Sequence, residues 1–254
     1  MSSRRTPRRN WQRGQTQNGT GSTPSREMFY ITDGSASNRY ELTTTLFPGA
    51  ASMTIGFVFR DTTPALTGSP QFYICSKYLS NNYGYRINHA FPSSTFDRFI
   101  AYMTASPPGN VNVIRDSGQL WDGVKWHTCV VRLHLNLCTI WIDGVQIGVA
   151  TGVSGFTPAS GNNLFQLYGP TGAASTSQYA AIVYAETALS DLEIPAWHAQ
   201  VSASNNFDFP GNVATEVFDA ADSDATWLGK KAYSPAVPLV GTVTKASVIN
   251  PVFA

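Results

Sequence analysis

Short segments in which apolar and polar residues alternate recur along most of this chain, with turn-forming residues between them. In residues 52–60, for example, apolar residues fall at every second position, which places their side chains on one face of an extended strand. Further strands are expected at residues 71–77, 83–88, 97–104, 110–115, 127–133, 137–142 and 177–186. About a dozen short strands, with turn signals about every 8–12 residues, predict an all-β fold, a two-sheet antiparallel β-sandwich.

The composition agrees with one folded β-domain. The chain has 254 residues, of which 43% are hydrophobic and only 13% are charged, which excludes a chain that is disordered throughout. No apolar run reaches the roughly 18 residues that a transmembrane helix needs, and no apolar segment typical of a secretion signal follows Met1. We therefore expect neither a membrane partner nor secretion.

The net charge of +1 hides an uneven distribution along the chain. Residues 1–26 hold six of the 17 basic residues and no acid, so the rest of the chain, with 11 basic and 16 acidic residues, has a net charge of −5. After Met1, Trp11 is the only large apolar residue of this segment, which therefore cannot bury enough surface to fold alone. We predict that residues 1–26 form a disordered basic arm and linker.

The arginines of this arm are candidates for nucleic-acid binding. Guanidinium groups match phosphate oxygens and stay charged at neutral pH, and each phosphate that they neutralise releases counterions. The residues expected to bind nucleic acid, without reading its sequence, are Arg4, Arg5, Arg8, Arg9 and Arg13. Alternative interpretations of the segment are a nuclear-import signal, a mitochondrial presequence, for which it lacks an apolar face, and an inert solubilising tail.

The most informative stretch is residues 120–148, in which a Trp-His pair opens one strand and an Asp-Gly turn ends the next. The pair is Trp126-His127, and the second strand and its turn read Ile-Trp-Ile-Asp-Gly at residues 140–144. Asp-Gly between two apolar strands is among the strongest hairpin signals in a sequence. This pattern resembles the laminin-G-like members of the concanavalin A-like lectin/glucanase superfamily.

The resemblance implies a concanavalin A-like jelly roll over residues 27–201. The residues to which it gives a structural role are Trp126, His127, Asp143 and Gly144. A further matching feature is a capping-box pattern formed by Ser190 and Glu193, which predicts one short helix near residues 190–200. Pro195 departs from the pattern, because proline disrupts a helix interior, and it predicts a helix that is short or starts after the capping box.

Residues 202–254 lie outside the resemblance. They begin with an acidic stretch and end in an apolar segment that is punctuated by prolines. We find no motif in this C-terminal extension, and we expect it to pack on the sandwich or on a neighbouring subunit.

Three cysteines are too few for a disulfide scaffold. With a turn at residues 134–136, Cys129 would lie opposite position 141 and Cys138 opposite position 132, so the two would not be cross-strand partners. We predict that both are free, buried thiols. Free thiols are typical of proteins that are assembled in a reducing intracellular compartment.

We find no motif for catalysis or for metal binding. The four histidines show no metal-ligand spacing, no Cys-x-x-Cys occurs, and His127 is interpreted as structural. The sandwich glucanases of the superfamily carry Glu-x-Asp-x-Glu on one strand, and this chain has no such motif. We therefore predict that the protein is not an enzyme and binds neither a metal nor a cofactor.

Trp141 is the candidate contact residue on the sandwich. If Ile140 and Ile142 face the core, Trp141 and Thr139 face the opposite side of the strand. An outward tryptophan is a candidate platform for a sugar or a candidate subunit contact. The alternative is that a second layer, such as the C-terminal extension, covers it.

Two functions remain open at this point. An arginine-rich arm joined to a β-sandwich is similar to the organisation of small-virus capsid proteins, which implies a structural protein of a virus particle. Such a capsid or head-decoration subunit would self-associate and would bind packaged nucleic acid. The alternative is a lectin-like module that binds a carbohydrate or glycoprotein, for which the fold is the support.

Overall fold

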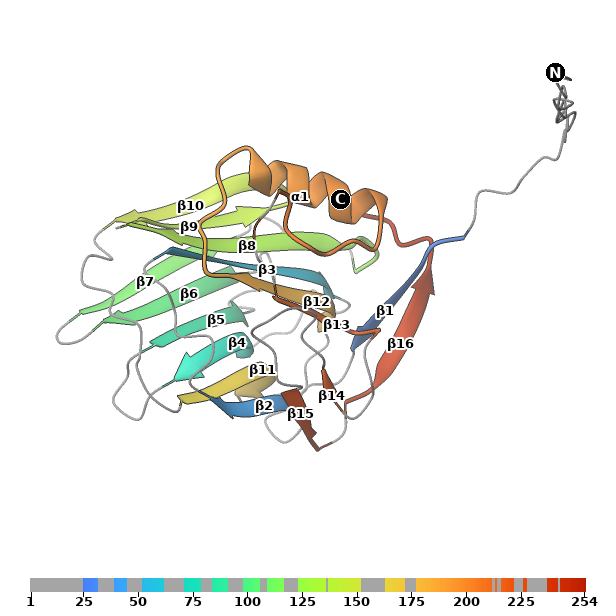
Figure 1. The fold of residues 1–254 in the computed structure, drawn as a ribbon, viewed down its shortest axis with the longest axis horizontal. Helices are drawn as coiled ribbons and strands as arrows, with labels where there is room; N and C mark the ends of the chain where they lie inside the picture. The colour runs from blue at the N-terminus through green and yellow to red at the C-terminus, as the bar shows by residue number, and fades with distance from the viewer. Residues whose placement is uncertain are drawn as a thin grey trace, which may run out of the picture.

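A computed structural model of the chain shows two β-sheets packed face to face, with one helix against the first sheet (Figure 1). The structure describes residues 25–31, 39–44, 52–61, 71–78, 84–90, 98–105, 109–116, 123–135, 137–151, 163–171, 177–211, 213, 216–221, 226–227, 237–241 and 243–254. Every pairing between the strands named in these residues is antiparallel. The predicted antiparallel β-sandwich is therefore confirmed.

The first sheet has eight strands, which come from both ends and from the middle of the chain. In spatial order they are β10 (Val145–Thr151), β9 (Leu137–Ile142), β8 (His127–His134), β3 (Ser52–Asp61), β12 (Ser177–Ala185), β1 (Glu27–Ile31) and β16 (Lys245–Ile249), with β13 (Glu216–Asp219) paired to β12. The hairpins β8–β9 and β9–β10 are local, whereas β3, β12 and β1 are joined only by long-range pairing.

The second sheet also has eight strands. In spatial order they are β14 (Thr226–Trp227), β15 (Val237–Val240), β2 (Arg39–Thr44), β11 (Asn163–Thr171), β4 (Gln71–Tyr78), β5 (Gly84–Ala90), β6 (Arg98–Ala105) and β7 (Gly109–Asp116). Strands β4 to β7 form a meander of sequence neighbours. The strands that were expected in both sheets are present, with ends that differ by at most two residues.

Strand β3 shows how the alternating pattern builds the core between the sheets. Its large apolar side chains are at most 1% exposed, and they are Met53, Ile55, Phe57 and Phe59. The rings of Phe57 and Phe59 lie 6.4 and 6.5 Å, between centroids, from the ring of Tyr179 on β12. Val58, which faces the other way, is also fully buried, so the first sheet is covered on its outer face as well.

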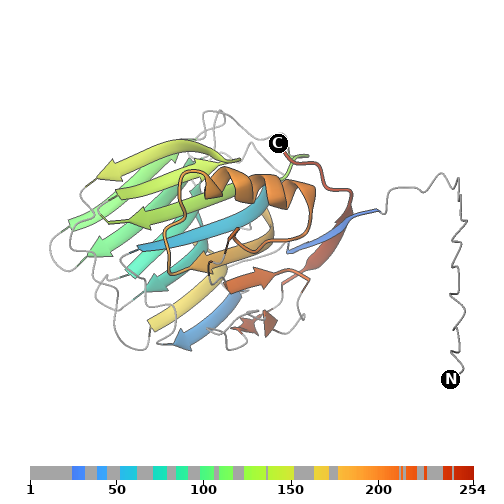
Figure 2. The same ribbon diagram turned by 45° about the horizontal axis from the view of Figure 1, so that its top comes forward.

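Helix α1 (Glu193–Ala203) is that cover, and it lies across the first sheet on the side away from the second sheet (Figures 1 and 2). Its buried residues Ile194, Trp197 and Val201 are spaced three and four apart, which places them on one side of the helix. Trp197 rests on Gly56 of β3, where a Cβ atom would lie only 2.7 Å from the indole. The close approach of α1 to the sheet therefore depends on a glycine at position 56.

Arg26 ties the start of the folded body to the end of α1. Its guanidinium donates hydrogen bonds of 2.6–2.7 Å to the carbonyl oxygens of Val201, Ser202 and Ser204 and to the side-chain oxygen of Asn205. The last carbonyl oxygens of a helix have no hydrogen-bond donor within the helix, and Arg26 supplies the donors for α1. Arg26 therefore belongs to the folded body, although the count of basic residues placed it in the N-terminal segment.

The C-terminal extension joins both sheets of its own sandwich. β13 pairs with β12, β15 pairs with β2, and β16 pairs with β1. Beyond β16, Phe253 forms an isolated bridge with Trp126. Strands β13, β15 and β16 are therefore parts of the two sheets.

The register of the β8–β9 hairpin differs by one residue from the predicted register. Cys129 pairs with Ile142 and Cys138 pairs with Leu133, because the connection contains two residues instead of three, the first being Leu135 at a φ of 53°. The prediction of free, buried thiols is nevertheless confirmed for Cys129 and Cys138. Burial raises the pKa of Cys138 to about 12 and raises that of Cys129 well above its ordinary value.

Candidate functional site

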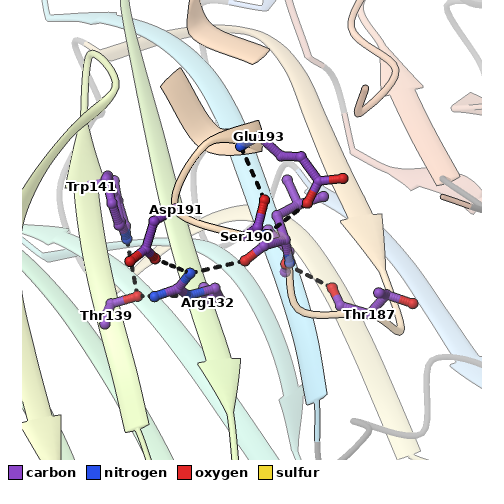
Figure 3. Close-up of polar contacts among 9 residues, drawn as sticks. Arg132, Thr139, Trp141, Thr187, Ser190, Asp191 and Glu193 are labelled. Atoms are coloured by element: carbon purple, nitrogen blue, oxygen red, sulfur yellow. Dashed lines mark hydrogen bonds and ion pairs between the residues drawn. The ribbon is translucent and has the colours of Figure 1, made fainter. Parts of the chain in front are cut away.

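On the first sheet, Trp141 lies beside Thr139, Arg132 and Asp191 (Figure 3). Trp141 lies on the outer face of this sheet, as the alternation predicted, but it is only 7% exposed and belongs to one apolar cluster with Trp197 of α1. The guanidinium of Arg132 lies 5.6 Å from the centroid of its ring, and its indole N–H donates a hydrogen bond of 3.0 Å to Thr139. A ring covered in this way has no free face for a sugar or a subunit, so the role expected for Trp141 is wrong. The apolar cluster that contains Trp141 includes residues of α1 and also Phe207, Phe209 and Val217 of the C-terminal extension.

Arg132 holds the segment before α1 against the sheet (Figure 3). Its Nη1 donates to the carbonyl oxygen of Leu189 at 2.9 Å and to the carboxylate of Asp191 at 2.5 Å, and its Nε donates to Thr139 at 3.2 Å. The side chain of Asp191 is 72% exposed, so the ion pair itself contributes little. The carbonyl contact and the stack on Trp141 are what fix the guanidinium in place.

The start of α1 is fixed by the predicted capping box. The backbone N–H of Ser190 donates to the carboxylate of Glu193 at 2.7 Å, and the backbone N–H of Glu193 donates to the hydroxyl of Ser190 at 3.3 Å. These hydrogen bonds lower the pKa of Glu193. The helix begins at Glu193, with Leu192 at the N-cap position, which is two residues later than a cap at Ser190 implies. The later start that Pro195 predicted is therefore observed, and Pro195 lies in the first turn, where a backbone N–H is not required. Thr54 of β3 anchors the same segment through the carbonyl oxygen of Thr187 at 2.7 Å.

The Asp143-Gly144 turn joins β9 and β10 with both residues at positive φ, 49° and 76°, as a two-residue hairpin requires. Nδ1 of His127 lies 2.7 Å from one carboxylate oxygen of Asp143, and the backbone N–H of Thr128 donates to the other at 2.9 Å. The backbone N–H of Asp143 donates in return to the carbonyl oxygen of Thr128 at 2.9 Å. Asp143 therefore ties the hairpin to β8, and the structure brings together the His127, Asp143 and Gly144 that the resemblance singled out.

His198 extends this cluster to α1. Its Nδ1 lies 2.9 Å from the hydroxyl of Thr128 and 3.8 Å from Asp143. Burial lowers the pKa of His198, the charge of Asp143 raises it, and His127 lowers it again. A histidine–aspartate pair beside a hydroxyl is also found in catalytic sites, but His127 and Thr128 are 3% and 1% exposed. Since a substrate cannot reach them, we interpret the cluster as structural.

Trp126 is fully buried, but it lies on the outer face of the first sheet rather than between the two sheets. The guanidinium of Arg60 and the ring of Tyr30 lie 4.9 and 5.4 Å from its ring. Its backbone N–H donates to the carbonyl oxygen of Val252 at 2.7 Å, and the backbone N–H of Ala254 donates to its carbonyl oxygen at 3.1 Å. The last residues of the chain therefore cover Trp126.

In the second sheet, the strand register lines up residues from distant parts of the chain. Strand pairing places one residue of each of the strands β2, β11, β4, β5, β6 and β7 in a line, and these are Glu41, Gln166, Ser76, Arg86, Tyr102 and Asn112. We call this line the polar row. The next line on the same face contains Thr43, Leu164, Tyr78, Gly84, Thr104 and Asn110.

Strand β2 decides on which face the polar row lies. Tyr40 is fully buried, whereas Glu41 is partly exposed. Because successive residues of a strand lie on opposite faces, the line of Tyr40 belongs to the inner face and the polar row to the outer face. The inner line is Tyr40, Leu167, Cys75, Ile87, Ala101 and Val113. Among the elements that the structure describes, α1 lies on the other sheet and none lies over the outer side of β4, β5 and β6 (Figures 1 and 2).

Sequence reasoning missed the polar row. Its members are spread between residues 41 and 166, and no short motif links them. The alternation within each strand shows which residues share a face, but only the pairing of distant strands brings them into one line. A preference for Asn, Tyr and Thr at alternate positions of the expected strands was the available signal.

The arginines predicted to bind nucleic acid, Arg4, Arg5, Arg8, Arg9 and Arg13, lie outside the described residues. Within the described residues, no three His, Cys, Asp or Glu side chains are grouped so that they could hold a metal ion. The helix that the structure describes is neither long nor apolar enough to cross a membrane.

No protein-family model and no curated protein matches this chain, whereas solved structures do. One is a native heptameric SAP-like pentraxin from Limulus polyphemus, which is 12% identical with a TM-score of 0.55 over 89% of this chain and 95% of the pentraxin. Another is the binding domain of botulinum neurotoxin DC in complex with rat synaptotagmin II, which is 13% identical with a TM-score of 0.52 over 70% of this chain.

The binding domain of botulinum neurotoxin serotype G is also similar, with 13% identity and a TM-score of 0.50 over 74% of this chain. The matches cover 46% and 48% of the two toxin chains, so this protein spans about half their length. At these identities the similarity is one of fold. It confirms the concanavalin A-like jelly-roll β-sandwich that the resemblance implied.

Proposed function

We propose that this protein is a non-catalytic recognition module that binds carbohydrate, free or on a glycoprotein, through the outer face of its second sheet. The observation that carries the proposal is the polar row together with its neighbouring line. The other broad face of the sandwich is closed by α1 and by the C-terminal residues around Trp126. The second sheet is therefore the broad face on which recognition is expected.

The residue types on this face suit a sugar ligand. Sugars present hydroxyl groups, which hydrogen-bond to amide, hydroxyl and guanidinium side chains. They also have apolar ring faces, which stack on aromatic side chains such as tyrosine. By strand register, the polar row and its neighbouring line contain Asn110, Asn112, Tyr78 and Tyr102. Two of the similar structures are binding domains by name, and another toxin binding domain of this fold was solved in complex with SialylT.

The small number of acidic residues on this face argues against a glycoside hydrolase. Glycoside hydrolysis uses two carboxyl groups that flank the scissile bond, about 5–10 Å apart. The polar row contains one acidic residue, Glu41, at its β2 end, and the neighbouring line contains none. The face is therefore suited to holding a glycan rather than to cleaving it.

A glycan array tests the proposal with one variant on the face and one matched control. Tyr102→Ala removes an aromatic ring from the polar row, whereas Phe29→Ala removes one from β1, where Phe29 is 40% exposed. We expect wild-type protein and Phe29→Ala to retain the same glycans, and Tyr102→Ala to lose them while keeping its melting temperature. Equal retention by all three proteins, or no retained glycan for wild-type protein, would overturn the proposal.

A second candidate function is a structural subunit of a virus particle, with a laminin-G-like sandwich and an arm that holds packaged nucleic acid. The five arginines of residues 4–13 support it, and so does Arg26, whose bonds to the end of α1 fix the point where this segment leaves the body. The buried free thiols Cys129 and Cys138 agree with assembly in a reducing intracellular compartment.

Sizing of the purified protein separates the two functions. A large particle that contains nucleic acid supports the virion subunit, whereas a small species that is retained on a glycan array supports the recognition module. Deletion of residues 1–24 leaves Arg26 in place and is expected to abolish salt-sensitive nucleic-acid binding without unfolding the sandwich. Nucleic-acid binding with an unchanged salt dependence after this deletion would rule out the arm as the binding element.

A further inference from the structure

We propose that Arg60, on the outer face of the first sheet, binds the carboxylate of an acidic peptide. The proposal does not rest on the carbohydrate-binding function, which concerns the second sheet. It follows from two arginine–tryptophan pairs on one face of the first sheet, of which one has its own carboxylate and the other does not.

The first pair, Arg132 with Trp141, finds all its partners within the chain (Figure 3). Nη1 of Arg132 donates to the carbonyl oxygen of Leu189 and to the carboxylate of Asp191. The indole N–H of Trp141 donates to the hydroxyl of Thr139. One short segment that offers a carbonyl oxygen and a carboxylate therefore satisfies this arginine.

The second pair, Arg60 with Trp126, is stacked in a similar way. Alternation along β3 places Arg60 on the same face as Val58, the outer one. Its guanidinium lies 4.9 Å from the ring centroid of Trp126 and 5.4 Å from that of Tyr30. Its Nε donates a hydrogen bond of 2.8 Å to the side-chain oxygen of Gln178, the Cα partner of Arg60 on β12. Two rings and one hydrogen bond therefore fix the guanidinium in place.

Within the part of the chain that the structure describes, the second pair lacks the acceptors that the first pair has. No carboxylate forms an ion pair with Arg60, and neither of its Nη groups donates a hydrogen bond. The indole N–H of Trp126 is buried and has no acceptor. Polar groups that are buried without a partner are unfavourable. The side chain of Arg60 is partly exposed, so a ligand can reach its Nη groups from solvent.

The open edge of Arg60 matches a carboxylate. With Nε engaged, the guanidinium presents Nη1 and Nη2, which fit the two oxygens of one carboxylate. The complete pair indicates what kind of molecule carries this group, because the acceptors of Arg132 are a backbone carbonyl and a side-chain carboxylate two residues apart in one segment. We expect the same two groups, from a partner peptide, at Arg60.

The indole N–H resonance of Trp126 reports on this site, because the ring of Trp126 stacks on the guanidinium. The chain has six tryptophans, and Trp126→Phe assigns the resonance in an NMR spectrum of the labelled protein. The probe is the capped peptide Ala-Leu-Ser-Asp-Leu, which is the sequence of residues 188–192. Its matched control has asparagine in place of aspartate. Methyl glucuronide and inorganic phosphate serve as a sugar acid and a free anion.

We expect the aspartate peptide to shift this resonance saturably at physiological salt, and the asparagine peptide to bind about tenfold more weakly or less still, since hydrogen bonds between charged groups contribute at that level. Arg60→Gln should weaken binding of the aspartate peptide by a similar factor. Arg60→Lys should also weaken it, because lysine keeps the charge but not the fork. Arg132→Gln is the matched control, since it removes a stacked arginine that already has its partners, and it should change the affinity by less than about twofold.

Two checks keep the result tied to Arg60. Melting temperature shows whether each variant is folded, and Arg60→Lys carries the test if Arg60→Gln does not fold. The titrations are repeated in the full chain with all five arginines of residues 4–13 replaced by glutamine, because these also attract anions. We expect the same affinity for the aspartate peptide in both backgrounds.

Several results would overturn the inference. The absence of a saturable shift, or equal binding of the two peptides, would show that Arg60 holds no carboxylate. Binding that survives both substitutions of Arg60, or that disappears when the five N-terminal arginines are replaced, would place the carboxylate elsewhere. Tighter binding of methyl glucuronide or of phosphate than of the aspartate peptide would mean that the ligand is a sugar acid or a free anion and not a peptide. None of these results bears on the polar row of the second sheet.

Discussion

Among single residues, Gly56 shows how closely α1 is packed on the first sheet. A Cβ atom at this position would lie 2.7 Å from the indole of Trp197 and 3.1 Å from the ring of Phe209. Both rings are buried and have little room to move. We therefore expect Gly56→Ala to lower the free energy of unfolding by about 1–3 kcal/mol, measured by chemical denaturation.

A second substitution tests whether that loss comes from the contact itself. Trp197→Phe shortens the ring that a Cβ atom at position 56 would meet. In the Trp197→Phe background, Gly56→Ala should lower the free energy of unfolding by less than it does in the wild-type background. If the losses of unfolding free energy from the two single variants simply add up in the double variant, steric contact between position 56 and Trp197 is not their cause.

The two tryptophans of the outer face should differ in their contribution to stability. Trp126 is fully buried under the last residues of the chain, whereas Trp141 is 7% exposed beneath Arg132. We expect Trp126→Ala to lower the free energy of unfolding by about 3–5 kcal/mol and Trp141→Ala to lower it by less. Denaturation of both variants under the same conditions measures the difference. A larger loss for Trp141→Ala would mean that the side chains packed around Trp141, and not the last residues of the chain over Trp126, provide the more important cover.

His198 makes the attachment of α1 sensitive to pH. Its pKa is lowered in the folded protein, chiefly by burial, so the unfolded chain binds the proton more readily. The stability that depends on neutral His198 is therefore present above the ordinary histidine pKa of about 6.5 and decreases as the pH falls through it. Unfolding free energies at pH 7.5 and 5.5 should show a smaller loss on acidification for His198→Gln than for wild-type protein. If His198→Gln loses as much unfolding free energy on acidification as wild-type protein, or more, the role of His198 is contradicted.

At the scale of elements, α1 is held at three points along its length. Ser190 and Glu193 fix its start, His198 contacts β8 in its middle, and Arg26 binds the carbonyl groups at its end. The sequence predicted the first of these from the capping-box pattern. It did not predict the other two, because they join the helix to residues that are 70 and more than 170 positions away.

Removal of Arg26 should loosen one end of α1 and leave the other in place. In Arg26→Gln the carbonyl oxygens of Val201, Ser202 and Ser204 lose a cationic donor. Backbone amides of the last turn should then exchange hydrogen faster, while amides near Glu193 keep the wild-type rate. Mass spectrometry of exchanging peptides measures both ends at once. Uniform acceleration along α1 would show that Arg26 stabilises the whole molecule and not the helix end.

For the whole molecule, the sequence predicted the strands and the two-sheet sandwich, but it did not predict which residues are covered or brought together on the outer faces of the sheets. Alternation and the Asp143-Gly144 turn predicted the strands and the β9–β10 hairpin, because these depend on neighbours in the chain. The cover over Trp141 could not be predicted, since alternation shows that a residue faces outward and not what packs on it. The polar row was hidden for a related reason, because it exists only through pairing of strands that are far apart in the sequence.

The most direct test of the account is to observe which tyrosines respond when a glycan binds. The chain has 11 tyrosines, and labelled rings can be assigned by Tyr→Phe substitution and followed by NMR during titration with a glycan retained on the array. We expect the resonances of Tyr102 and Tyr78, on the outer face of the second sheet, to shift with ligand concentration. The resonances of Tyr30 and Tyr179, in the first sheet, should stay in place. Shifts confined to the tyrosines of the first sheet would contradict the claim that the second sheet is the recognition surface.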